Sequence, residues 1–279
     1  MSFFTYVFGK GYTGGPDFSQ LKTFQFEFED AYLNVTLPRS NVTISHGEIG
    51  INYPYRSSGW FDERCEQLAN HFSVHVFTEM WGYLGPYWKV MNEPFGVLGL
   101  RVEIKRTLPE KILNLNNLDT LAEAIRWDYE WYFEEAEPGK YGQGCNREVR
   151  QEAEDEYNSR HPKIPEEKKL RDKEKTLQSL LRELPTQFET RQFGDQEWLY
   201  YALKREPNYP AHYYCHPLDE EYYLCIRFGY RIDFRDYFHL WQADAESAEQ
   251  RIMEMIKLTF PNRLTGPKEG VPENGVKSD

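Results

Sequence analysis

The feature that most constrains the fold is a run of alternating apolar and polar residues in the C-terminal third of the chain. Between residues 222 and 234 every second residue is apolar, and the residues between them are mostly charged or small. The apolar series consists of Leu224, Ile226, Phe228, Tyr230, Ile232 and Phe234. Because successive side chains of a strand point to opposite faces of a sheet, this pattern predicts a β-strand with one buried face.

The N-terminal part of the chain alternates in the same way. Residues 24–28 and 31–37 alternate on either side of Glu29-Asp30, which predicts a β-hairpin. Residues 98–104 predict another strand, residues 74–77 a shorter one, and a second hairpin is expected around His46-Gly47. Further strands are expected over residues 197–203 and 212–215.

Apolar residues at helical spacing predict helices between these strands, over residues 61–72, 170–184 and 244–260. A further helix is expected to begin at Asn117 or Asp119, either of which is a favourable N-cap. Its buried stripe should consist of Leu118, Leu121, Ile125, Tyr129 and Tyr132.

The sequence changes character between Pro138 and Pro165, where glycine, proline and charged residues dominate. We therefore predict an α+β fold of two subdomains, each a mainly antiparallel sheet with packed helices. Residues 1–137 form the first subdomain and residues 166–260 the second. Residues 138–165 form a linker, and residues 261–279 a disordered tail. The helix after Asp119 should pack on a sheet that contains residues 98–104.

The composition limits the type of partner. A hydrophobic content of 40%, with 16% aromatic residues, supports a packed core, and the net charge is −12. This charge argues against binding to nucleic acid and favours a basic protein partner. The chain has neither a signal-like start nor an apolar run of the ~20 residues that span a membrane, so we expect a cytoplasmic protein without a membrane partner. Four cysteines without a CxxC motif are typical of reduced thiols.

No motif for a catalytic site, a cofactor or a metal is found, so we expect none of the three. The best zinc candidate combines His212, Cys215, His216 and Cys225, but a strand would hold the two histidines ~13 Å apart. Cys145 with His161 lacks the basic surroundings of a reactive thiol. The aromatic stretch from Trp81 to Trp88 is either a docking loop or part of the core, and we favour the core.

One segment stands out as a partner surface. Residues 119–137 contain seven carboxylates and only Arg126 as a basic residue, interleaved with aromatic rings. Rings supply contact area in an interface, and carboxylates attract a basic partner. The predicted interface residues are Asp128, Glu130, Trp131, Glu134, Glu135 and Glu137. The simpler alternative is an amphipathic helix with a solvated acidic face.

The general organisation resembles that of bacterial immunity proteins, which neutralise toxins delivered by type VI secretion or other contact-dependent routes. The resemblance lies in the strand over Leu224–Phe234, followed by Phe238-His-Leu-Trp241 and the segment Asp244–Phe260. It implies tight binding of a cognate toxin, and the acidic charge favours a nuclease. Two alternatives remain: a hydrolase that uses scattered acidic residues, and a structural protein of a phage or mobile element.

Overall fold

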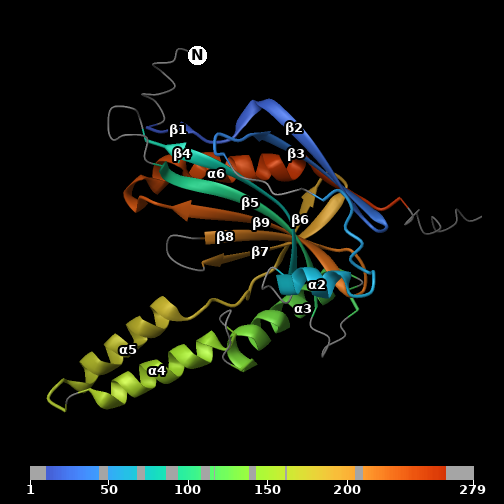
Figure 1. Ribbon diagram of the computed structural model, residues 1–279. Helices are drawn as coiled ribbons and strands as arrows, with labels where there is room; N and C mark the ends of the chain where they lie inside the picture. Colours follow the sequence, from blue (N-terminus) through green and yellow to red (C-terminus); the bar gives the residue numbers. More distant parts are fainter. Residues whose placement is uncertain are drawn as a thin grey trace, which may run out of the picture.

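Two antiparallel sheets form the frame of the molecule (Figure 1). The computed structural model describes residues 11–43, 50–67, 73–85, 94–107, 114–115, 117–137, 143–160, 162–204 and 210–261. The larger sheet has the order β1 (Thr13–Gly14), β4 (Ser73–Leu84), β5 (Pro94–Arg106), β9 (Tyr222–Ile232), β8 (Pro210–Pro217), β7 (Gln196–Lys204) and β6 (Glu189–Phe193). The smaller sheet has the order β10 (Ile256–Thr259), β3 (Ala31–Arg39) and β2 (Asp17–Phe28). The predicted α+β class with mainly antiparallel sheets is confirmed. The described residues of the second predicted hairpin, 42–43 and 50–53, are not antiparallel strands, and Asn52 instead forms an isolated parallel bridge with Glu27.

The larger sheet is continuous across both halves of the chain, so the predicted division into two subdomains with separate sheets is wrong. Strand β5 pairs with β9 over their whole length, from Gly96 opposite Ile232 to Arg106 opposite Tyr222. The physical reason is that each strand, left at a sheet edge, would expose a long row of unpaired backbone groups. Pairing the two strands satisfies both rows and joins their apolar faces.

The main core lies between the two sheets and helix α6 (Arg235–Glu254). The apolar residues of β5 and β9 point into it, together with Phe26 and Leu33 of the smaller sheet and Trp241 of α6. Trp81 and Tyr83, expected in the core rather than in a docking loop, are buried residues of β4. The end of that stretch, residues 86–88, lies outside the described residues.

Helix α3 (Leu118–Glu130) covers part of the opposite face of the larger sheet. Asn117 caps it through a capping box with Thr120, as one of the two expected caps. Leu121 and Ile125 of the predicted stripe are buried against the aromatic residues of β7 and β8, whereas the rest of the stripe is only half-buried. The expectation that this helix packs on the sheet containing residues 98–104 is confirmed.

Helix α3 continues into a π-helical turn, η1 (Trp131–Glu135). It is followed by α4 (Cys145–Ser159) and α5 (Glu166–Leu180), which form a helical hairpin that projects away from the sheets (Figure 1). Ion pairs between Arg160 and Asp172 and between Lys173 and Glu154 join the two helices. Most of the expected linker is therefore helix α4, while residues 138–142 lie outside the described residues.

Several element boundaries differ from the sequence-based expectations. Strand β6 was not predicted, and α6 begins at Arg235 rather than at residue 244. The predicted helix over residues 244–260 is wrong at its end, where Ile256 and Leu258 face the core as alternate residues of β10. Helix α2 (Trp60–Gln67) begins one residue before the helix expected over residues 61–72. Residues 68–72, the centre of the second hairpin and the expected tail after residue 261 lie outside the described residues.

None of the described helices is both long and apolar enough to span a membrane.

Candidate functional site

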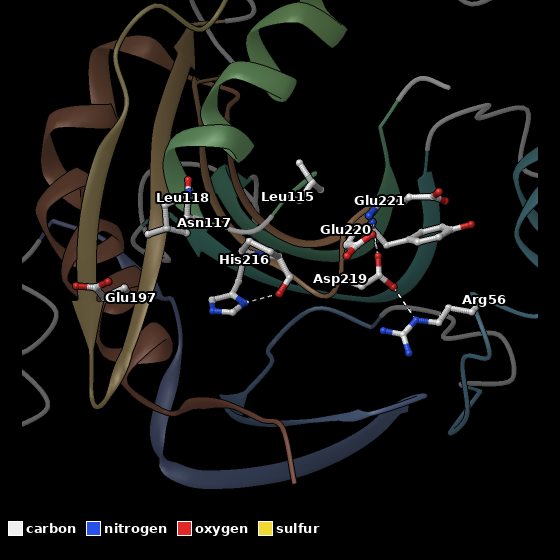
Figure 2. A pocket seen from close by; sticks show the side chains of 11 residues that line it. Arg56, Leu115, Asn117, Leu118, Glu197, His216, Asp219, Glu220 and Glu221 are labelled. Atoms are coloured by element: carbon white, nitrogen blue, oxygen red, sulfur yellow. Dashed lines mark hydrogen bonds and ion pairs between the residues drawn. The ribbon is translucent and has the colours of Figure 1, made fainter. Parts of the chain in front are cut away.

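A cavity of about 960 Å³ opens beside the N-terminal end of α3 (Figure 2). We call it the acidic cavity. It is built from four segments that are distant in sequence: the turn before α2, the segment entering α3, the start of β7, and the β8–β9 connection. The lining residues are Arg56, Leu115, Asn117, Leu118, Glu197, His216, Pro217, Asp219, Glu220, Glu221 and Tyr222.

The charge of this cavity is negative. Its lining contains four carboxylates, on Glu197, Asp219, Glu220 and Glu221, and one basic side chain, Arg56. Asp219 accepts a hydrogen bond from Nε of Arg56 at 2.7 Å, so these two charges compensate each other. The other three carboxylates belong to exposed residues, and together they leave an excess of negative charge at the cavity.

The β8–β9 connection that carries these carboxylates is firmly held. The carboxylate of Asp219 also accepts hydrogen bonds from the backbone N–H groups of Glu221 and Tyr222, at 2.9 and 2.8 Å. The backbone carbonyls of Glu220 and Glu221 accept from the N–H groups of Leu115 and Thr107. The cavity therefore presents its charges from a fixed backbone, which lowers the conformational cost of binding a ligand.

His216 and the aliphatic residues complete the cavity wall. Nδ1 of His216 lies 2.8 Å from the carbonyl oxygen of Pro217, and its Nε2 contacts the side-chain amide of Gln196. Both ring nitrogens are thus engaged, and the described lining holds no serine, threonine or cysteine that could act as a nucleophile. Leu115 and Leu118 supply apolar contact. This arrangement suits a cationic side chain with an aliphatic stem.

In the structure, the carboxylates of the acidic segment 119–137 lie in different surroundings. Glu134 accepts hydrogen bonds from Arg150 and from Nδ2 of Asn146, and Glu137 pairs with Arg147 at 3.2 Å. The hydrogen bonds from Arg150 are the main reason that the pKa of Glu134 is lowered.

Two of the predicted interface carboxylates thus contact helix α4. Of the other predicted residues, Glu130 and Glu135 are exposed, whereas Asp128 and Trp131 are half-buried.

A second polar cluster, which the sequence did not indicate, lies under α6. Glu249 is 1% exposed and its carboxylate contacts Nδ1 of His212 at 2.9 Å. The same carboxylate accepts hydrogen bonds from the hydroxyls of Tyr214, at 2.6 Å, and Tyr230. The carboxylate is thus surrounded by donors from the sheet, as a buried charge must be.

The structure separates the residues of the zinc candidate. His212 and His216 lie on the α6 side of β8, whereas Cys215 and Cys225 lie opposite each other on the α3 side as free thiols. Among the described residues, no three His, Cys, Asp or Glu side chains are placed to hold one metal ion. Burial raises the pKa of the Cys145 thiol, and His161 lies outside the described residues.

The acidic cavity was missed because its residues come together only in the folded chain. The one local signal was the acidic run Asp219-Glu220-Glu221 before the longest alternating strand. Comparisons with protein-family models, with curated proteins and with solved structures find no match to this chain.

Proposed function

We propose that this protein is a cytosolic immunity protein of a contact-delivered toxin–immunity pair, as in type VI secretion. Its partner is a basic toxin, specifically a nuclease, which it binds and neutralises. The observation that carries this proposal is the acidic cavity, with three exposed carboxylates on a fixed backbone and a volume of about 960 Å³. No nucleic acid and no membrane take part in binding.

The physical argument rests on complementarity. A nuclease carries arginine and lysine side chains on the surface that holds the phosphate backbone. The acidic cavity is large enough to receive such side chains, and its wall is partly aliphatic. Arginine side chains buried at the centre of an interface are frequent hot spots. An inhibitor that captures these side chains removes the charge on which the toxin depends to bind its substrate.

The two acidic regions have different roles in this proposal. Glu197, Glu220 and Glu221 at the cavity form the contact that holds the toxin. Glu130 and Glu135, which are exposed on α3 and η1, contribute with the net charge of −12 to attracting it. Charges outside the contact mainly increase the association rate. Glu134 and Glu137 belong to the α4 contact and are not assigned to the interface.

A survival assay tests the proposal. Cells express the toxin encoded by the neighbouring gene together with this chain or a variant, and colony counts are compared. We expect the chain to protect, and Glu220→Lys with Glu221→Lys to remove protection at equal protein level. Glu152→Lys, an exposed change on α4, is the matched control and should protect fully. Failure of the unchanged chain to protect against this toxin contradicts the proposal.

One observation favours the alternative, a hydrolase. His212 and Glu249 form a carboxylate–imidazole pair, and the His212 side chain is 23% exposed. Such pairs orient a catalytic base in many enzymes. We rank this reading second because Glu249 is also bound by two tyrosine hydroxyls and holds α6 on the sheet.

A further inference from the structure

The α3-side face of the larger sheet carries rows of side chains set by the strand register. In one row, Thr78, Arg101, Arg227, Tyr213 and Tyr201 lie side by side from β4 to β7. In the next row, Met80, Gly99, Gly229, Ala211 and Leu203 follow the same order of strands. The second row has small residues at its centre, so the sheet surface is hollowed there.

This hollow is a cavity of about 360 Å³, which we call the arginine cavity. Its floor is formed by Gly99 and Gly229, which are directly opposite each other. Arg101 and Arg227 line one side, and Val97 and Arg231 line the other. The described lining contains three arginines and no carboxylate, in a protein whose net charge is −12. Its volume falls within the range of about 300–1,000 Å³ that is usual for small-molecule sites.

The positive charge at this cavity is only partly balanced by neighbouring carboxylates. Arg101 and Arg227 are directly opposite in the β5–β9 ladder, where like charges repel. The buried carboxylate of Glu103 lies 2.8 Å from Nε of Arg101 and 3.8 Å from Nζ of Lys105. One carboxylate therefore serves at least two cations.

Arg227 contributes one buried hydrogen-bond donor that lacks an acceptor. Its Nε is buried and has no hydrogen-bond partner among the described residues. Its guanidinium carbon lies 5.9 Å from the centre of the Tyr213 ring, which supports the group from one side. A buried donor without an acceptor costs free energy, and an anion in the cavity would remove this cost. Arg231, in contrast, is paired with Asp233 at 3.1 Å.

We propose that the arginine cavity binds a small organic anion, with a phosphate or carboxylate head between Arg101 and Arg227 and an apolar body over the glycine floor. Met80 and Val97 provide the apolar contacts, and the glycines let the ligand approach the backbone closely. Arginine suits this task because its planar fork of donors matches the oxygens of phosphate and carboxylate. This site is separate from the acidic cavity and does not depend on the toxin partner.

Calorimetric titration with phenyl phosphate tests this site. Inorganic phosphate and phenol, titrated separately, represent the two halves of this probe. Benzoate shows whether a carboxylate head group binds as a phosphate head group does. We expect phenyl phosphate to bind at one site and more tightly than either half. Arg227→Gln should weaken its binding roughly tenfold or more, because a hydrogen bond to a charged group is lost. Arg64→Gln removes an exposed arginine of α2 and should leave the binding constant unchanged.

A second variant tests the floor without changing any charge. A Cβ at Gly99 would meet its nearest neighbours at ordinary contact distances, 3.7 Å from the carbonyl oxygen of Gly229 and 3.9 Å from Cγ of Met80. Gly99→Val should therefore fold, fill the cavity and weaken phenyl phosphate binding. In amide NMR spectra of the unchanged protein, the signals of Gly99 and Gly229 should shift on titration. The proposal is overturned if phenyl phosphate does not bind, binds no better than inorganic phosphate, or binds both the Arg227 and the Gly99 variants normally.

Discussion

Glu249 lies on α6 with its carboxylate facing three donors from the larger sheet. Burial, and after it the charge of Glu249, raises the pKa of both Tyr214 and Tyr230, so their hydroxyls stay protonated and donate. His212 completes the set at 2.9 Å. The cluster links α6 to β8 and β9 through polar contacts inside an otherwise apolar layer.

We expect Glu249→Ala to lower the free energy of unfolding by about 3 kcal/mol, because two buried tyrosine hydroxyls and the half-buried His212 lose their shared partner. Urea unfolding followed by circular dichroism measures this change. Glu246→Ala is the matched control: Glu246 is exposed on the same helix and accepts a hydrogen bond from Gln242. That control should change stability by no more than about 0.5 kcal/mol. Equal effects of the two substitutions would contradict the role given to Glu249.

Glu103 should make stability depend on pH on the acid side. Burial alone would raise its pKa, but the charges of Lys105, Arg101 and Arg227 outweigh burial and lower the pKa below its ordinary value of 4.5. The unfolded chain therefore takes up this proton first as the pH falls. The stabilisation by Glu103 is present above about pH 4.5 and is lost as the pH falls through the lower pKa of the folded state.

Glu103→Gln should remove this part of the pH dependence. We expect the variant to be less stable than the unchanged protein at neutral pH, and the difference to shrink as the pH is lowered from about 6 to about 3. Urea unfolding at each pH measures it. A constant difference across this range would show that the pKa of Glu103 is the same in both states.

At the scale of elements, Asn146 joins the helical hairpin to the rest of the molecule. It is 1% exposed, and its Nδ2 donates to Glu134 and to the carbonyl of Arg182 at 2.9 and 3.0 Å. Its Oδ1 accepts from the N–H of Arg182 at 2.6 Å. One side chain therefore connects η1, the start of α4 and the segment after α5.

Asn146→Ala should loosen this hairpin without unfolding the sheets. The backbone N–H of Arg182 loses its acceptor, and we expect amides of α4 and α5 to exchange with deuterium roughly tenfold faster. Amides of β5 and β9 should keep their protection. Asn158→Ala, an exposed change on α4, is the control. Equal acceleration in the hairpin and in the central strands would contradict a local role of Asn146.

Elements with a strong local pattern could be predicted from the sequence. Alternation identified the hairpin of β2 and β3 and the strands β5 and β9, and apolar spacing with the Asn117 cap identified α3. Strand β10 could not be recognised, because Ile252 and Ile256 have helical spacing and continue the pattern of α6. Its strand conformation depends on pairing with β3, more than 200 residues earlier in the chain. The local pattern of residues cannot predict pairing with a strand that distant in sequence.

At the scale of the whole molecule, the pairing of strands that are distant in sequence could not be predicted. The break between Pro138 and Pro165 is real in composition, but it contains helix α4 and the turn into α5, and it is not a boundary between sheets. The acidic cavity depends on the same long-range pairing, because β9 brings residues 219–222 beside α3 and the turn that carries Arg56. The excess charge of residues 119–137 could be recognised in the sequence, but the pairing of Glu137 with Arg147 and of Glu134 with Arg150 could not.

The most direct test of the proposed function is the dissociation constant between this protein and the toxin encoded by the neighbouring gene, inactivated for purification. It is measured by biolayer interferometry for the unchanged chain, for Glu220→Lys with Glu221→Lys, and for the Glu152→Lys control, at about 50 mM and about 300 mM NaCl. We expect the double variant to bind at least roughly a hundredfold more weakly, mainly through a faster off-rate, and the control to bind normally. Association of the unchanged chain should slow at the higher salt concentration. Unchanged binding by the double variant, or no binding by the unchanged chain, would contradict the acidic cavity as the toxin site.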